Sequence, residues 1–98
     1  MPLAEKLLDE RLLLDDGSIL SVRLWRVPAP VPPATHHFKY SLFYGRPRER
    51  LVLFDNERGK GDHKHIRAVE SPYAFENPEK LVADFQAAVR AVREEGGR

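Results

Sequence analysis

The chain has 98 residues, and we expect residues 1–98 to form a single domain, since domains run from about 50 to 250 residues. It contains no cysteine, which excludes disulfides, thiolate metal sites and thiol nucleophiles and favours a reducing, cytoplasmic location. No apolar run approaches the roughly 20 residues that span a bilayer, and the charges at Glu5 and Lys6 argue against a signal peptide, so no membrane partner is expected.

The net charge of +1 conceals an uneven distribution. Residues 1–16 carry two cations against five acids, whereas residues 46–67 carry seven cations against four acids. All four histidines lie between positions 36 and 65, so a lower pH would add charge to the basic half. This pattern favours an anionic partner such as RNA or DNA.

A turn signal at Asp15-Asp16-Gly17-Ser18 separates two apolar runs, and an Asp-Gly pair in that position is a strong hairpin cue. The sequence therefore predicts a β-hairpin over residues 5–14 and 18–27. Its second strand alternates, with Leu20, Val22 and Leu24 on one face. Trp25 is predicted to pack in the core, with base stacking beside Lys39 as the alternative.

The proline-rich residues 28–33 cannot lie inside a strand or helix and predict an extended crossover loop. Residues 36–45 alternate again, with Phe38, Tyr40, Leu42 and Tyr44 on one face. A turn at residues 45–47 then leads into a strand over residues 50–54, and the basic run at residues 46–50 is interpreted as a solvated hairpin tip.

A helix is predicted from about residue 78 to residue 94. Asn77 can cap it, Pro78 suits its first position, and an apolar stripe that includes Leu81, Phe85 and Val89 should be buried. Ser71-Pro72 is interpreted as a turn before the helix, and Gly96-Gly97 as its C-terminal stop. The fold class is therefore α+β, an antiparallel β-sheet of four or more strands with a C-terminal helix packed on one face.

The segment from Asp55 to His65, Asp-Asn-Glu-Arg-Gly-Lys-Gly-Asp-His-Lys-His, gathers most of the side chains that do chemistry on phosphates or metals, and its glycines predict a shaped loop. His63 and His65 are suited to cleave a phosphodiester, because near neutral pH one imidazole can accept a proton while the other donates one. RNA is favoured over DNA, since its 2′-OH can be the nucleophile and no metal-activated water is needed.

The other charged residues of this segment complete the hypothesis. Lys60 and Arg58 would stabilise transition-state charge, and Asp55 would orient a histidine or Lys60. The backbone around Gly59 and Gly61 could form a phosphate nest, for which a tight turn is the alternative. The predicted catalytic residues are His63, His65, Lys60, Arg58 and Asp55, and the predicted nucleic-acid-binding residues are Lys64, Gly59, Gly61, Arg67 and Lys39.

Two other interpretations of the histidines stay open. They could only cap or hydrogen-bond a loop. They could also bind a metal, with Asp55, Asp62, His36 or His37 as a third ligand, although the cations nearby oppose a divalent ion. The sequence assigns no cofactor and no metal.

Several strings of the sequence occur together in one known family. They are Leu-Leu-Leu-Asp-Asp-Gly-Ser at 12–18, Arg-Leu-Trp-Arg-Val-Pro at 23–28, Lys-Tyr-Ser-Leu at 39–42, Asp55-Asn56, Gly59-Lys60-Gly61 and His63-x-His65. Through them the chain resembles the TumE-like toxins of toxin–antitoxin pairs over nearly its full length. An aromatic residue, often tyrosine, commonly precedes the aspartate in this family; here it is Phe54, which removes any role for a hydroxyl at that position.

The resemblance implies a small cytoplasmic protein that acts on RNA and works with a helix-turn-helix antitoxin. We expect the antitoxin to cover the central segment, with acidic residues meeting Arg58, Lys60 and Lys64. The competing class is a non-catalytic module in which the same basic residues only bind nucleic acid. The sequence leaves open whether the chain forms a homo-oligomer.

Overall fold

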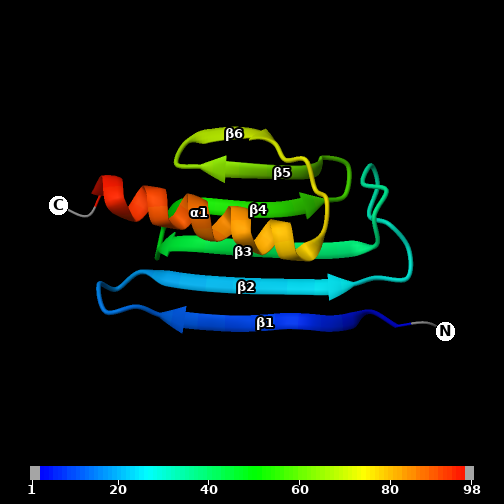
Figure 1. Ribbon diagram of the computed structural model, residues 1–98, viewed down its shortest axis with the longest axis horizontal. Coiled ribbons are helices and arrows are strands. Elements are labelled where there is room, and N and C mark those ends of the chain that lie inside the picture. Colours follow the sequence, from blue (N-terminus) through cyan, green and yellow to red (C-terminus); the bar gives the residue numbers. More distant parts are fainter. Residues whose placement is uncertain (1–2, 97–98) are drawn as a thin grey trace.

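The computed structural model describes residues 3–96, which form a six-stranded antiparallel sheet with one helix on one face (Figure 1). In chain order the elements are β1 (Glu5–Leu13), β2 (Ile19–Arg26), β3 (Phe38–Arg46), β4 (Glu49–Glu57), β5 (Gly61–Ile66), β6 (Val69–Pro72) and α1 (Pro78–Gly96). Each strand pairs with the one before it, so the order in the sheet is the order in the chain. The predicted α+β class and the predicted first hairpin are confirmed.

The core lies between α1 and the middle of the sheet. Alternation along β3 turns Tyr40, Leu42 and Tyr44 towards the helix, and each is at most 3% exposed. Phe85 of α1 is 1% exposed and meets the ring of Phe54 edge-on, with centroids 5.9 Å apart. Burying each such side chain contributes about 1.5–3 kcal/mol. The predicted burial of Leu81, Phe85 and Val89 is confirmed.

The start of α1 follows the predicted cap. The Asn77 Oδ1 atom accepts a hydrogen bond from the Lys80 backbone N–H at 2.7 Å, and Pro78 occupies the first helical position. The helix ends at Gly96, as predicted, whereas Gly97 lies outside the described residues. The predicted turn at Ser71-Pro72 is instead the end of β6, and the chain leaves the sheet after Pro72.

The central segment is not the predicted loop. β4 extends to Glu57 and β5 starts at Gly61, so residues 58–60 alone form the connection. Gly59 and Gly61, with φ of 88° and 80°, give this turn its left-handed backbone. The residues His63-Lys64-His65 lie in β5 and alternate between the two faces of the sheet. Both histidines are buried on one face, and Lys64 is half-buried on the other.

Two further predictions are wrong. The proline-rich loop joins the neighbouring antiparallel strands β2 and β3, so it is no crossover. It folds back onto the β4–β5 turn, where the Pro32 carbonyl accepts the Gly59 N–H at 2.8 Å. Trp25 is half-buried on the sheet face away from α1, because alternation along β2 turns its neighbour Leu24 into the core. Lys6 Nζ lies 5.7 Å from the Trp25 ring.

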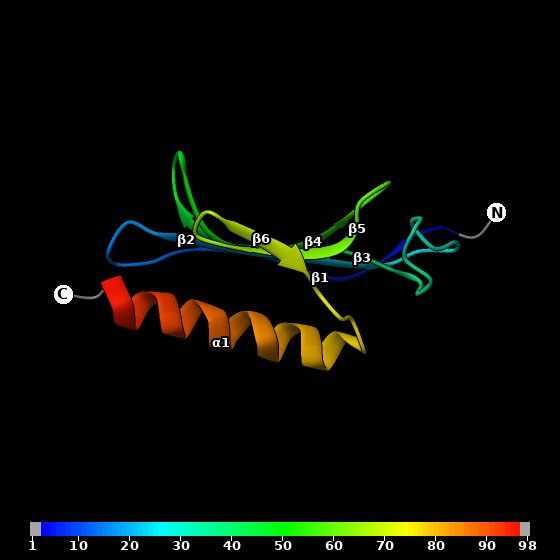
Figure 2. The same ribbon diagram turned by 90° about the horizontal axis from the view of Figure 1, so that it is seen from above.

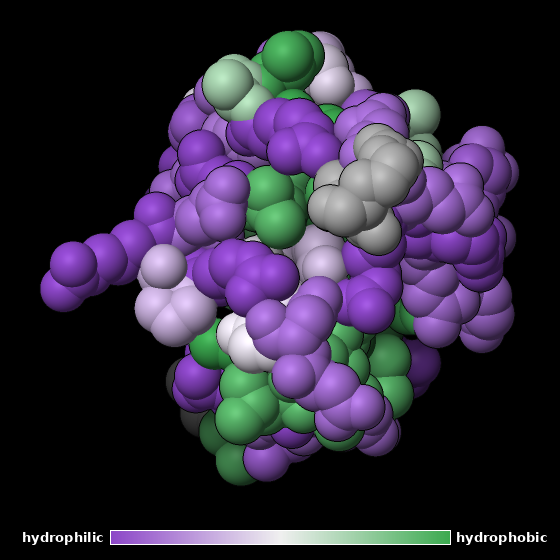
Figure 3. Space-filling view, turned by 90° about the vertical axis from the view of Figure 1, so that its left-hand side faces the viewer, coloured by the Kyte–Doolittle hydropathy of each residue, from purple (hydrophilic) through white to green (hydrophobic). Residues whose placement is uncertain are grey.

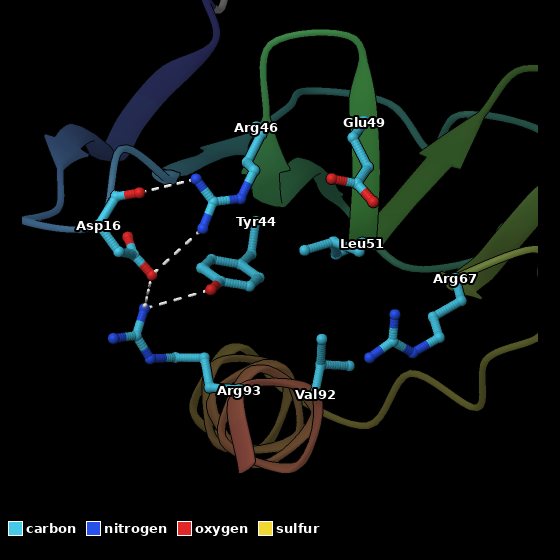
Figure 4. Close-up of a pocket in the computed structure, with 8 residues that line it drawn as sticks. All are labelled: Asp16, Tyr44, Arg46, Glu49, Leu51, Arg67, Val92 and Arg93. Atoms are coloured by element: carbon cyan, nitrogen blue, oxygen red, sulfur yellow. Dashed lines mark hydrogen bonds and ion pairs between the residues drawn. The ribbon is translucent and has the colours of Figure 1, made fainter. Parts of the chain in front are cut away.

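A polar cluster joins the β1–β2 turn to the end of α1 (Figure 4). Arg46 donates to the Asp16 carbonyl at 2.7 Å and lies 3.6 Å from its carboxylate. Arg93 also approaches that carboxylate at 3.6 Å and donates to the Tyr44 hydroxyl at 3.2 Å. The adjoining pocket of about 250 Å³ is therefore bordered by arginines that already have protein partners. The polar cluster connects the sheet to the helix. Residues 46–50 are all exposed, so the predicted solvated hairpin tip is confirmed, and Arg46 also pairs with Asp16.

The sheet face away from α1, called the open face here, carries no helix, and the tips of the β3–β4 and β4–β5 hairpins rise on that side (Figure 2). At the edge of the sheet, β1 exposes Leu12 and Leu13, and apolar atoms gather at the bottom of the end view in Figure 3. Within residues 3–96, no helix is long and apolar enough to cross a membrane.

Candidate active site

Strand register brings the predicted catalytic residues of two strands together on the open face. Asp55 of β4 lies opposite His63 of β5, and His65 lies opposite Glu70 of β6. The same row continues through Ser41, which pairs with Asp55. Three strands that follow one another in the chain thus place two imidazoles and two carboxylates side by side.

The closest contact in this group joins Asp55 and His63. The Oδ1 atom of Asp55 lies 2.8 Å from Nε2 of His63, and the His63 side chain is 5% exposed. The direction of approach is not that of a hydrogen bond, and both atoms are buried without a hydrogen-bond partner. The other ring nitrogen, Nδ1, is 2.9 Å from the Gly61 carbonyl, to which it can only donate. The geometry thus fixes the ring and directs Nε2 to the cluster.

Glu70 lies at the centre of the cluster. One of its carboxylate oxygens is 3.0 Å from Lys60 Nζ, 3.5 Å from His65 Nε2 and 3.7 Å from His63 Nε2. The hydrogen bond with Lys60 lowers the pKa of Glu70 and raises the pKa of Lys60. A cavity of about 300 Å³ adjoins Lys60, His63 and Glu70. The cluster therefore already holds one anionic group between a lysine and two imidazoles.

Burial sets the protonation of the other two residues. It raises the pKa of Asp55, against the lowering effect of His63 beside it. Burial also lowers the pKa of His65, and the nearby charge of Arg50 adds to this effect. His65 is consequently held towards its neutral form, in which one ring nitrogen is free to accept a proton.

The β4–β5 turn brings in the remaining predicted residues. Arg58 is exposed at its tip. The N–H groups of Gly59 and Lys60 already bond to the carbonyls of Pro32 and Glu57, at 2.8 and 3.0 Å. A phosphate nest would need those donors, so the geometry favours the tight-turn interpretation of Gly59 and Gly61.

The predicted nucleic-acid-binding residues divide between the two faces. Lys39 is on the open face, where its Nζ donates to the Asn56 carbonyl at 2.8 Å. Lys64 is on the helix side, with its Nζ 6.0 Å from the ring of Phe54. Arg67, in the β5–β6 turn, pairs with Glu95 of α1 at 3.3 Å. Lys39 is thus the one member of these three that shares the face of the histidines.

The other metal ligands suggested by the sequence do not join the cluster. Asp62 points to the helix side, where it accepts hydrogen bonds from the Tyr40 hydroxyl at 2.6 Å and lies 2.7 Å from His36 Nε2. His37 is exposed near the carbonyl of Val27. Sequence reasoning missed Glu70, which enters through the β5–β6 hairpin. The turn between these strands has no glycine or asparagine, and Arg67 takes the positive φ of 56°, so no turn signal revealed the pairing.

A comparison with protein families gives a match to the family described as Toxin TumE, over residues 3–93. The chain belongs to the TumE toxin family. Membership indicates a toxin of a toxin–antitoxin pair and implies an antitoxin partner. Neither a curated protein nor a solved structure matches the chain. The resemblance to the TumE-like toxins, drawn from strings over nearly the full length of the chain, is therefore confirmed. Residues of the Asp55–His65 string supply most of the cluster on the open face.

Proposed function

We propose that this TumE-family toxin is an endoribonuclease that cleaves RNA in the cytoplasm by metal-independent acid–base chemistry on its open face. The observation that carries the proposal is the position of the Glu70 carboxylate, within 3.0 Å of Lys60 Nζ and within 3.7 Å of Nε2 of both His63 and His65. A phosphodiester in place of this carboxylate would lie between two imidazoles and a cation. Glu70 is 42% exposed at its side chain, so it can move aside.

The two histidines divide the proton transfers. One takes the proton of the ribose 2′-OH while the 2′ oxygen forms a bond to phosphorus, and the other gives a proton to the 5′ oxygen as the bond from phosphorus to that oxygen breaks. The products are a 2′,3′-cyclic phosphate and a free 5′-OH. Asp55, with Oδ1 2.8 Å from Nε2 of His63, helps to orient that ring.

Charge on the phosphorane-like transition state is stabilised by cations of the β4–β5 turn. Lys60 already meets the cluster through Glu70, and Arg58 lies two residues before it at the exposed tip. Both belong to a short hairpin that the proline-rich loop supports through the Gly59 N–H. This support holds the turn that carries Lys60 beside the cluster.

The remaining open face offers a path for the RNA chain. Lys39 donates to the carbonyl of Asn56, the residue after Asp55, and across the β2–β3 pairing it faces Trp25. Trp25 is half-buried there and so presents part of its ring for base stacking, and Arg23 occupies the same row as Ser41 and Asp55. Lys64 and Arg67 lie off this face, and the proposed path leaves them out.

The antitoxin, of the helix-turn-helix class, is proposed to inhibit the toxin by covering the open face. An acidic segment would pair with Arg58 and Lys60, the exposed cations of the β4–β5 turn. Charge reversal at Arg58 should then weaken antitoxin binding more at low salt than at high salt. Lys64, on the helix side, serves as the control position.

The mechanism is tested with purified protein, labelled RNA and excess chelator. We expect cleavage to continue and to leave a 2′,3′-cyclic phosphate. Cleavage that stops in chelator and returns with a divalent ion would overturn the metal-independent mechanism and keep the enzyme.

Expression in a bacterial host separates an enzyme from a module that only binds. We expect growth arrest with the natural sequence and none with His65→Ala, while the variant still binds RNA. Loss of arrest together with loss of RNA binding would favour the non-catalytic alternative. The exposed His37→Ala variant is the matched control.

A further inference from the structure

The contact between Asp55 and His63 is short but is not a hydrogen bond. With the His63 Nδ1 hydrogen directed at the Gly61 carbonyl, the Nε2 atom of the neutral ring carries a lone pair. That lone pair lies 2.8 Å from Oδ1 of Asp55, and both atoms are buried without a hydrogen-bond partner. Two electron-rich atoms this close require either a proton or a metal ion beside them.

His65 and Glu70 lie at distances from His63 and from each other that suit the ligands of one metal ion. Ligand bonds of about 2.0–2.1 Å in a tetrahedral zinc site place neighbouring ligand atoms about 3.4 Å apart. The Glu70 oxygen lies 3.5 Å from His65 Nε2 and 3.7 Å from His63 Nε2. The ligand atoms of His63, His65 and Glu70 all lie within 4.8 Å of one another.

We propose that His63, His65 and Glu70 bind Zn²⁺, with the Asp55 carboxylate beside His63 but outside the set of ligands. Two imidazole nitrogens and a carboxylate oxygen are a donor set that this ion accepts readily. The Gly61 carbonyl already performs the task of an outer-shell partner, because it orients a ligating histidine through its other nitrogen.

The cations whose positions in the sequence opposed a divalent ion do not block the proposed zinc site. Lys64 lies on the opposite face of the sheet. Arg58 is exposed at the tip of the turn. Lys60 holds Glu70 at 3.0 Å, but its side chain is 51% exposed on a short hairpin, so it can swing into solvent when the ion takes its place.

Bound zinc would inhibit RNA cleavage, a consequence that rests on the proposed function. The ion takes the lone pairs of His63 and His65 that proton transfer requires, and it fixes Glu70 where the phosphodiester should enter. Zinc and RNA therefore compete for one site.

Direct binding tests the site without reference to activity. Calorimetric titration of the full chain with Zn²⁺ should give one ion per chain. His65→Ala and Glu70→Gln should each weaken binding by more than the roughly 10–100-fold that loss of an outer-shell partner costs. The His37→Ala control should bind as the natural sequence does. An absence of binding, or equal binding by Glu70→Gln, would overturn the site and leave the ribonuclease proposal standing.

Cleavage assays then test the consequence. We expect full activity in chelator and a progressive loss as Zn²⁺ is added, with RNA raising the zinc concentration needed. Cleavage that requires zinc would overturn both the inhibition and the metal-independent mechanism. Zinc that binds without any effect on cleavage would overturn the inhibition alone.

Discussion

Neighbouring residues on β4 and β5 belong to two polar clusters that face opposite sides of the sheet. On the helix side, Asn56 is fully buried, and its amide accepts from the Tyr40 N–H at 3.0 Å and donates to the Phe38 carbonyl at 2.7 Å. On the open face, Asp55 and His63 leave buried atoms without a hydrogen-bond partner. Saturated hydrogen bonding indicates a structural role, and unsatisfied buried atoms mark a place where a ligand or proton is expected.

The largest difference between the clusters should appear in catalysis. His65→Ala removes one member of the acid–base pair, and we expect the cleavage rate to fall by about 10²–10⁴. Single-turnover measurements on labelled RNA give this rate, and thermal unfolding checks that the variant is folded. A loss smaller than threefold would remove His65 from the pair.

Next in size is the contrast between two lysines of the same hairpin. Lys60→Ala should slow cleavage by about 10²–10³, the usual cost of losing one transition-state donor. Lys64→Ala should leave the rate nearly unchanged, because its side chain is on the helix side. Measured rates that fall equally in both variants would contradict the assignment of the open face as the active one.

For stability, the helix-side cluster should matter more than the cluster on the open face, the reverse of the order expected for catalysis. Asn56→Ala leaves two buried backbone groups without partners, and we expect a loss of about 2–4 kcal/mol in the free energy of unfolding. Asp55→Asn should change it by less than about 1 kcal/mol, since Oδ1 has no hydrogen bond to lose. Urea denaturation measures both, and a larger loss in Asp55→Asn would assign Asp55 a structural role.

The smallest effect is expected at a cluster that is satisfied but exposed. Hydrogen bonds from Lys80 and then Tyr73 lower the pKa of Asp84. A lowered folded-state pKa contributes stability above the unfolded value of about 3.9, and this contribution is lost as the pH falls through the folded value. Because the pair is exposed, we expect no more than about 0.5–1 kcal/mol. Urea curves between about pH 2 and pH 6 for the natural sequence and Asp84→Asn should differ by this amount, and parallel curves would contradict the linkage.

Local patterns in the sequence determined most of the fold. Alternation identified β2 and β3, the Asp-Gly pair identified the first hairpin, and the capped apolar stripe identified α1, because each is a property of neighbours in the chain. The same reasoning placed Asp55, Lys60, His63 and His65 in one candidate site, since they lie within eleven residues of sequence.

The tertiary structure alone decided which of these residues share a face. The alternation of β5 sends His63 and His65 to the open face and Asp62 and Lys64 to the helix side. The sequence predicted a loop here, in which the two histidines would share a side only if the backbone were extended. Glu70 joined the cluster only through the pairing of β5 with β6, across a turn without the usual residues. Register sets such contacts, and one residue of slip would reverse every side chain, so a site built across three strands is fixed only once the strands have paired.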